Sequence, residues 1–163
     1  IVPLIICKYF YERQRLNFNG SSLHIIIDEA RNVLSTTSER ESQTWKDYRL
    51  ETFEEIIKEG RKFGTFLTIS SQRPSDISET IISQLHNYFI HRLVNNEDIR
   101  AIGKAVAFID NTSYEMISVL PQGACIFTGV ASNFPVLVQV DLLPKQQQPQ
   151  SSTINLTELW KEP

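Results

Sequence analysis

A short apolar run at residues 23–27 is followed directly by two acidic residues, Asp28 and Glu29. Consecutive β-branched residues over this length predict a strand, and a strand that is apolar throughout predicts burial on both faces of a parallel sheet. The carboxyl ends of such strands form the edge at which open α/β proteins bind ligands. The two carboxylates are therefore expected at a ligand-binding edge.

A second apolar run, residues 65–70, ends close to the polar residues Gln72 and Arg73. The segment 52–63 between the two runs has apolar residues at helical spacing, and Gly64 follows it as a helix-capping glycine would. Strand and helix thus alternate, which is typical of an α/β fold. Two neighbouring strand ends that carry polar groups imply one shared crevice.

The rest of the pattern predicts an α/β domain with a mostly parallel sheet flanked by helices and a carboxyl-terminal hairpin. Further helices are expected over residues 3–16 and 97–106, and a third strand over 88–93. The hairpin is expected from strands 124–128 and 136–140, joined through residues 129–135. Shorter helical segments are expected within 75–85 and over 111–119.

The polar segment from Ser35 to Tyr48 has no apolar periodicity and predicts a mobile loop. This loop and its border contain Arg40, Lys46 and Arg49, which could contact DNA phosphates without reading bases. A solvated insertion with no ligand is the alternative. The sequence does not separate the two.

Length and composition predict one folded domain and a short tail. The 163 residues are 41% hydrophobic, which is enough for a single core over residues 1–144. The glutamine-rich run after Pro144 predicts a linker, so residues 145–163 are assigned to a linker and tail. The sequence begins with Ile1 rather than Met, which suggests a fragment of a longer polypeptide. A net charge of -3 argues against nucleic-acid binding by bulk charge, although a basic lining in one channel stays possible.

The two cysteines and the amino-terminal residues bear on localisation. Cys7 and Cys125 both lie in apolar runs and are expected to be buried thiols, which fits a reducing, cytoplasmic compartment. The apolar residues 1–7 are far fewer than the roughly 20 that a membrane-spanning helix needs. No membrane association is therefore expected.

The chemistry of the acidic pair fits half of a magnesium–nucleotide site. Asp28 suits support of Mg²⁺, and Glu29 suits polarisation of an attacking water. The alternative is that both acids cap the helix that follows. A complete site also needs the loop G-x-x-x-x-G-K-[ST], but residues 60–65 lack the lysine after the second glycine. Either the phosphate loop lies upstream of Ile1, or the protein is not a nucleotide hydrolase.

Taken together, four segments resemble the HerA-like branch of the HerA–FtsK ATPases, hexameric motors that act on double-stranded DNA. The matching segments are IIIDEA at 25–30, EGRKFG at 59–64, SQRPS at 71–75 and LPQG at 120–123, before a strand. Their order and spacing extend over about residues 2–143. The resemblance implies the distal half of a RecA-like P-loop ATPase core, the part that follows the phosphate loop.

The resemblance also implies a role for each site residue, with ATP and Mg²⁺ as cofactors. Asp28 would support Mg²⁺ through water, and Glu29 would orient and activate the hydrolytic water. Arg61 would be an arginine finger that reaches a neighbouring subunit's site. Gln72 would sense the γ-phosphate, and Arg73 would be a second phosphate-facing or interface arginine.

Each of these roles has a structural alternative. Arg61 could simply stabilise the end of a helix through the helix dipole. Gln72 could satisfy backbone groups of the turn at Pro74, and Arg73 could form a surface salt bridge.

At the level of the whole protein, the resemblance implies a homo-oligomer, with a hexamer as the expected ring, that acts on double-stranded DNA. The expected partner is a NurA-like nuclease or, in antiviral defence, an effector such as a sirtuin-like NAD-degrading protein. Two rival interpretations stay open: a conjugation or secretion ATPase, and a degenerate ATPase half that acts as an assembly scaffold. The chain alone is expected to be inactive, because it lacks the phosphate loop.

Overall fold

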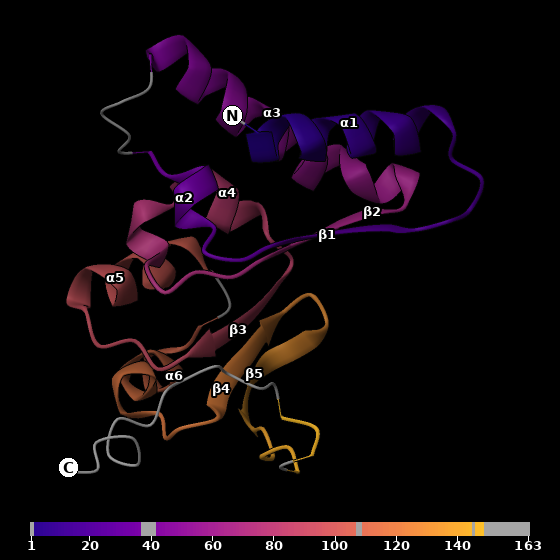
Figure 1. Ribbon diagram of the computed structural model, residues 1–163. Coiled ribbons are helices and arrows are strands. Elements are labelled where there is room, and N and C mark those ends of the chain that lie inside the picture. Colours follow the sequence, from indigo (N-terminus) through magenta and orange to yellow (C-terminus); the bar gives the residue numbers. More distant parts are fainter. Residues whose placement is uncertain (1, 37–41, 107–108, 145, 149–163) are drawn as a thin grey trace, which may run out of the picture.

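The computed structural model is an α/β arrangement with two small sheets (Figure 1). It describes residues 2–36, 42–106, 109–144 and 146–148. The helices are α1 (Val2–Leu16), α2 (Arg31–Leu34), α3 (Gln43–Glu59), α4 (Glu79–Gln84), α5 (Asn96–Ala105) and α6 (Asn111–Met116). The strands are β1 (Leu23–Ile27), β2 (Thr65–Ile69), β3 (Asn87–His91), β4 (Ala124–Gly129) and β5 (Ser132–Gln139). Single 3₁₀ turns are η1 (Gly60–Phe63), η2 (Pro74–Asp76) and η3 (Ile117–Val119).

Strands β1 and β2 pair in parallel, as the sequence predicts. Their register runs from Leu23 opposite Thr65 to Ile27 opposite Ile69, so the two strands end side by side. Because α3 lies in the connection between them, the two strands form a β-α-β unit with both carboxyl ends at one edge of the sheet. The polar residues that follow the two strands therefore start from adjacent points.

The second sheet has the strand order β3-β4-β5, with both pairings antiparallel. The hairpin β4–β5 confirms the expected carboxyl-terminal hairpin, but its turn is shorter than predicted, because β5 already begins at Ser132. Pro135 lies inside β5, and a proline is tolerated there because β5 is an edge strand. Gly129 has a φ of 132°, and a Cβ at this position would lie 2.2 Å from the His86 carbonyl oxygen. Only glycine fits this close approach.

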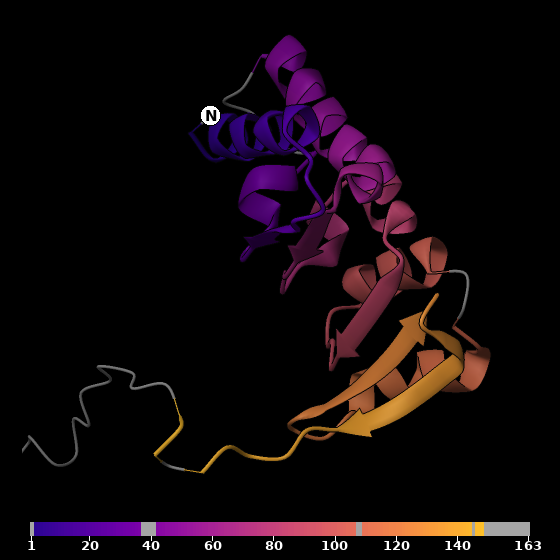
Figure 2. The same ribbon diagram turned by 90° about the vertical axis from the view of Figure 1, so that its right-hand side faces the viewer.

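The core lies between the helices and the inner faces of the strands. Helix α3 packs against α1, α4 and β2. Figure 2 shows α1 and α3 on the same side of β1 and β2. The largest buried side chains come from most of these elements and include Tyr11, Leu34, Phe53, Ile56, Ile81, Ile117 and Leu120.

The expectation that β1 is buried on both faces is wrong for the described chain. Ile27 is 8% exposed and faces the helices, whereas Ile26 is 74% exposed on the opposite face. On that open face, His24 stacks on Phe66 of β2 with ring centroids 5.1 Å apart. The physical reason is that the described helices cover only one face of the parallel pair (Figure 2).

The predicted mobile loop over residues 35–48 is also partly wrong, because α3 already begins at Gln43. Arg49 is only 6% exposed and donates hydrogen bonds to the carbonyl oxygens of Val33 and Ser35, the latter at 3.1 Å. It therefore faces the protein interior rather than a DNA channel. Arg40 lies outside the described residues.

Helix α1 keeps an apolar stripe on its outer side. Leu4 and Tyr11 are buried against the rest of the chain, whereas Ile5, Tyr9 and Phe10 are exposed. Despite this apolar surface, no described helix is both long enough and apolar enough to cross a membrane.

Candidate functional site

Asp28 and Glu29 form the tight turn that leaves β1 and enters α2. The Ser70 backbone amide donates to the Ile27 carbonyl oxygen at 2.9 Å, and the Ala30 amide donates to the Ser70 carbonyl oxygen at 2.8 Å. These bonds fasten the turn to the end of β2. Glu29 has a φ of 48°, a left-handed conformation that costs a non-glycine residue roughly 1–2 kcal/mol. Its amide donates to Asp28 Oδ1 at 3.0 Å, which helps to hold this conformation.

Gln72 meets Glu29 across the ends of the two parallel strands. The Gln72 Nε2 donates to Glu29 Oε1 at 2.9 Å, although the residues are 43 positions apart in the sequence. Both side chains are at the surface of the described chain. The structure therefore brings together the two groups that the sequence places in one crevice. The alternative in which Gln72 serves only the Pro74 turn does not describe this contact.

Arg73 and a residue that sequence reasoning missed, Arg31, surround this pair. Arg73 Nε lies 3.7 Å from Asp76 Oδ2, and Arg31 Nη1 lies 3.8 Å from the same oxygen. Arg31 Nε also lies 3.9 Å from Glu29 Oε2. Exposed pairs at such distances contribute about 0–1 kcal/mol each. Arg73 thus forms the surface salt bridge named as its alternative. Arg31 could have been found from its position, because it is a basic residue only two positions after Glu29.

Arg61 lies at the other end of β2. It belongs to η1, which precedes β2, whereas Glu29 and Gln72 follow the ends of β1 and β2. A five-residue strand is roughly 16 Å long, so Arg61 does not reach Glu29 within one chain. Within the described part of the chain, Arg61 has no ion-pair partner, while the adjacent Lys62 pairs with Glu59 at 2.5 Å. Arg61 is therefore separated from the other predicted site residues.

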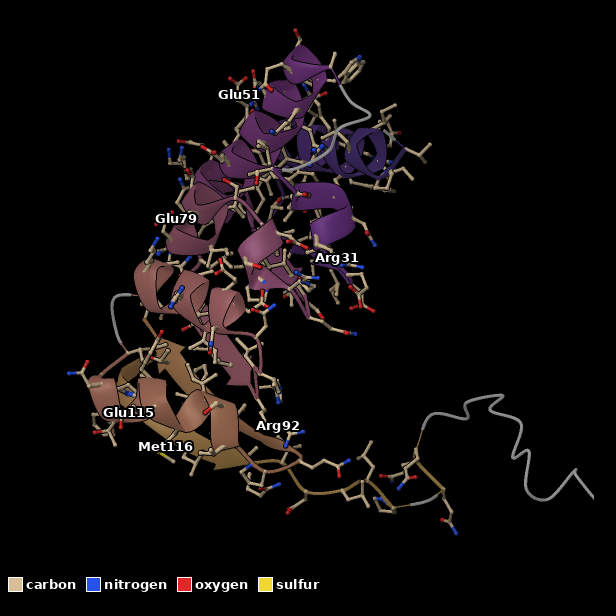
Figure 3. The ribbon with its side chains drawn as sticks, turned by 90° about the vertical axis from the view of Figure 1, so that its left-hand side faces the viewer. Arg31, Glu51, Glu79, Arg92, Glu115 and Met116 are labelled. Atoms are coloured by element: carbon tan, nitrogen blue, oxygen red, sulfur yellow. The ribbon has the colours of Figure 1, made fainter. Side chains whose placement is uncertain are left out.

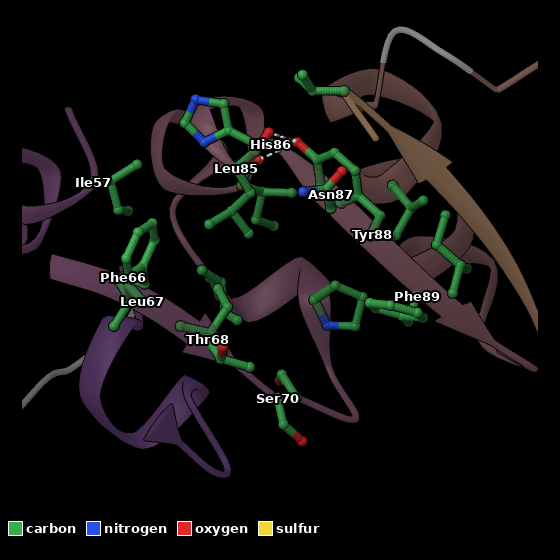
Figure 4. Close-up of a pocket in the computed structure, with 18 of the residues that line it drawn as sticks. Ile57, Phe66, Leu67, Thr68, Ser70, Leu85, His86, Asn87, Tyr88 and Phe89 are labelled. Carbon is green, nitrogen blue, oxygen red and sulfur yellow. Dashed lines mark hydrogen bonds between the residues drawn. The ribbon is translucent and has the colours of Figure 1, made fainter. Parts of the chain in front are cut away.

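A cavity of about 850 Å³ separates β2 from β3. Figure 4 shows Phe66, Leu67 and Thr68 of β2 across from Tyr88 and Phe89 of β3. In the described sheets, β2 pairs only with β1, and β3 pairs only with β4, so the two strand edges that border the cavity have no strand partner. The cavity also reaches the carboxyl edge, where its lining includes Ser70 and Ser71.

The cavity wall is mainly apolar, and its polar lining residues include Arg61, Thr65 and Tyr88. The Tyr88 hydroxyl donates to the carbonyl oxygens of Ile82 and Leu85 at 2.7 and 2.9 Å. Burial raises the pKa of Tyr88, so its hydroxyl stays protonated and able to donate at neutral pH. The mainly apolar wall suits a further segment of polypeptide.

The described residues include no group of three or more His, Cys, Asp or Glu side chains that could hold a metal ion. Mg²⁺ in nucleotide sites is typically held by one or two protein oxygens together with phosphates and waters. Asp28 is an exposed carboxylate at the strand end, and this donor suits that kind of site. Asp28 is thus a carboxylate that could contribute to such a site.

Sequence reasoning missed one further residue near the site, Asp98 in the first turn of α5. Asp98 is 3% exposed and accepts hydrogen bonds from Ser75, three positions after Gln72. Its burial could have been predicted from helical spacing, because Asp98 shares a helix face with Ile102 and Ala105, which are both buried.

Comparison with known proteins places the chain in a family, although no family model matches it. It is 31% identical over 138 residues to the DNA double-strand break repair helicase HerA of Sulfurisphaera tokodaii, which covers 85% of this chain and 26% of that protein. It is 38% identical over 85 residues to the HerA helicase of Pyrococcus furiosus, which covers 52% of this chain and 15% of that protein. Over most of its length the chain is similar to HerA helicases, as a fragment of a HerA-like ATPase would be. This HerA-like chain spans about a quarter or less of the length of these relatives.

Solved structures support the same fold for the HerA-like chain. The genome packaging NTPase B204 from Sulfolobus turreted icosahedral virus 2, in complex with AMPPCP, aligns with a TM-score of 0.61 at 18% identity. The alignment covers 84% of this chain and 63% of that one. The same NTPase in complex with ATP-gammaS aligns with a TM-score of 0.59 over 82% and 62% of the two chains. The predicted P-loop ATPase fold is confirmed.

Proposed function

We propose that this HerA-like chain supplies the residues that bind Mg²⁺ and the attacking water in the nucleotide site of an ATP-driven DNA motor. The observation that carries the proposal is the 2.9 Å hydrogen bond from Gln72 to Glu29 at the shared edge of β1 and β2. It joins the carboxylate proposed to activate water to the side chain proposed to sense the γ-phosphate. Names of the relatives, which include repair helicases and a packaging NTPase, support a motor that acts on DNA.

Each residue at the edge has a distinct task in this proposal. Asp28 would help to hold Mg²⁺ through a water, and the bound ion would neutralise charge on the phosphate oxygens. Glu29 orients the attacking water and accepts its proton. Gln72 exchanges its bond with Glu29 for one with the γ-phosphate, which releases the carboxylate to bind water.

The phosphate-binding loop is supplied by a segment outside these residues, on a strand that lies between β2 and β3. Three features support this position: the 850 Å³ cavity, its apolar wall and the two unpaired edges. Figure 2 shows β1, β2 and β3 pointing the same way, so a parallel strand fits both edges. The end of that strand would emerge beside Ser70 and Ser71, next to Glu29. The chain alone is then expected to lack ATPase activity.

Arg61 acts on a neighbouring subunit, because its own site is a strand length away. A guanidinium suits phosphate oxygens, and an arginine finger contributes roughly 10³- to 10⁵-fold to rate. Hydrolysis therefore needs an oligomer, for which a hexamer on double-stranded DNA is proposed. A NurA-like nuclease or a sirtuin-like effector stays the proposed partner. Arg73 stays a proposed interface residue, next to Asp76.

The proposal is tested in the intact protein with Glu29→Gln, which removes the base but keeps the shape. ATP hydrolysis should fall at least 100-fold, while ATP binding measured by calorimetry stays within about threefold. Glu51→Gln is the matched control, because Glu51 is an exposed acid on α3 that lies far from Arg31 and the site (Figure 3). Unchanged hydrolysis by Glu29→Gln would contradict the proposal and favour a non-hydrolysing scaffold.

A further inference from the structure

Asp98 is a buried acid that the proposed chemistry does not use. It lies in the first turn of α5 and is 3% exposed. Its Oδ1 accepts two hydrogen bonds from one residue, the Ser75 amide at 3.1 Å and the Ser75 hydroxyl at 2.7 Å. A buried carboxylate is costly unless donors surround it. The donors of Ser75 and the amino-terminal end of α5 compensate this cost. Asp98 therefore links η2, which contains Ser75, to α5.

Ser75 lies near the end of the segment 70–76, which contains Gln72. The segment starts at Ser70, which exchanges backbone hydrogen bonds with the turn of Glu29 through Ile27 and Ala30. It ends in η2, which packs against α5. Gln72 itself lies between these two fixed points and is exposed. The position of its amide thus depends on both ends of the segment.

The η2 turn is also hydrogen-bonded to the end of α2 and to the residues that follow it. The Thr36 amide donates to the Asp76 carbonyl oxygen at 3.2 Å, and the Ser78 amide donates to the Leu34 carbonyl oxygen at 3.3 Å. These bonds join Asp76 and Ser78, at and just after the end of η2, to Thr36 and Leu34, just after and at the end of α2. Asp98 is the side chain that holds η2 from the opposite side, that of α5. Without the Asp98 carboxylate, η2 would keep its packing against α5 but lose the two hydrogen bonds to Ser75.

We infer that Asp98 is a positioning residue that fixes the Gln72 segment through Ser75, so that the Gln72 amide reaches Glu29 and, in turnover, the γ-phosphate. The inference rests on the proposed function. A misplacement of about 1 Å at a reacting centre can reduce a rate about 100-fold, and a loosened segment samples such displacements. The Asp98 carboxylate bonds to Ser75, three residues after Gln72, so its effect on the site passes through the Gln72 segment in this inference.

The test measures steady-state ATP hydrolysis by the intact protein. Asp98→Ala should lower kcat about tenfold and leave KM for ATP within twofold. Asp98→Asn should recover most of the rate, because its side-chain oxygen can accept both Ser75 bonds. Glu97→Ala is the matched control, since Glu97 is the adjacent exposed acid of the same helix turn, and it should leave kcat unchanged.

The deciding measurement is the double variant Gln72→Ala with Asp98→Ala. If Asp98 acts through Gln72, the double variant hydrolyses ATP at the rate of Gln72→Ala alone. Rates that multiply instead would overturn the inference, as would a change confined to KM. If Asp98→Ala does not fold, Ser75→Ala replaces it, with a loss of about threefold and the same comparison.

Failure of the inference and failure of the proposed function are distinguishable. When hydrolysis depends on Glu29 but the Gln72 and Asp98 effects multiply, only the positioning role is wrong. When hydrolysis does not depend on Glu29, the proposed function falls and the role of Asp98 falls with it.

Discussion

Arg49→Ala should destabilise the protein rather than weaken DNA binding. Arg49 is 6% exposed and ties α3 to the chain after α2 through the carbonyl oxygens of Val33 and Ser35. Removing the guanidinium takes a donor from each acceptor, and a buried acceptor that loses its donor costs about 1–3 kcal/mol. The buried hydrocarbon stem adds lost packing. We expect the free energy of unfolding to fall by about 2–5 kcal/mol.

The assay is urea denaturation of the intact protein, with DNA affinity measured in parallel at one salt concentration. Arg92→Ala is the matched control, because Arg92 is exposed near the end of β3 (Figure 3), and its unfolding free energy should change by less than about 0.5 kcal/mol. If Arg49→Ala unfolds at the wild-type urea midpoint and loses DNA affinity, the structural role is refuted. The DNA-contact hypothesis for residues 35–49 would then be restored.

Three further predictions concern the oligomer, the hairpin and the isolated chain. Arg61→Ala in the intact protein should abolish hydrolysis and spare ATP binding, and mixing it with Glu29→Gln subunits should restore part of the rate; loss of ATP binding would count against a role across the interface. Gly129→Ala should lower the free energy of unfolding by roughly 2–5 kcal/mol in thermal denaturation, from the strain of a positive φ and the clash with the His86 carbonyl oxygen, and an unchanged melting temperature would show that the hairpin turn can relax. Residues 1–163 alone should release no phosphate from ATP in a malachite-green assay, whereas turnover that Glu29→Gln abolishes would show that the phosphate loop is dispensable.

Local patterns in the sequence predict most elements because they act over a few residues. The acidic residues after 23–27 and the polar residues after 65–70 are placed correctly at one edge, since both strands are parallel and in register. The start of α3 was missed because Arg49 occupies an inward position that an apolar residue would normally mark. The exposure of Ile26 was missed because burial of a face depends on what covers it, which the strand's own sequence does not specify.

The sequence predicted the residues at the strand ends of the candidate site but not the residues that contact them from other segments. Glu29 and Gln72 were found from strand ends, and their contact confirms that they share one edge. The partners of Arg31 and Asp98 were missed because these side chains reach Asp76 and Ser75, which lie in a distant segment of the chain. Arg61 was named by resemblance, and its distance from the edge leaves its role a prediction about a neighbouring subunit.

The most direct test of the central claim is a crystal structure of the intact protein with Mg²⁺ and AMPPCP, a non-hydrolysable ATP analogue. We predict that Gln72 then donates to a γ-phosphate oxygen, that Glu29 holds a water in line with the γ-phosphorus, and that Asp28 contacts a water of the Mg²⁺ shell. A nucleotide bound elsewhere, with the Gln72–Glu29 hydrogen bond unchanged, would contradict the account.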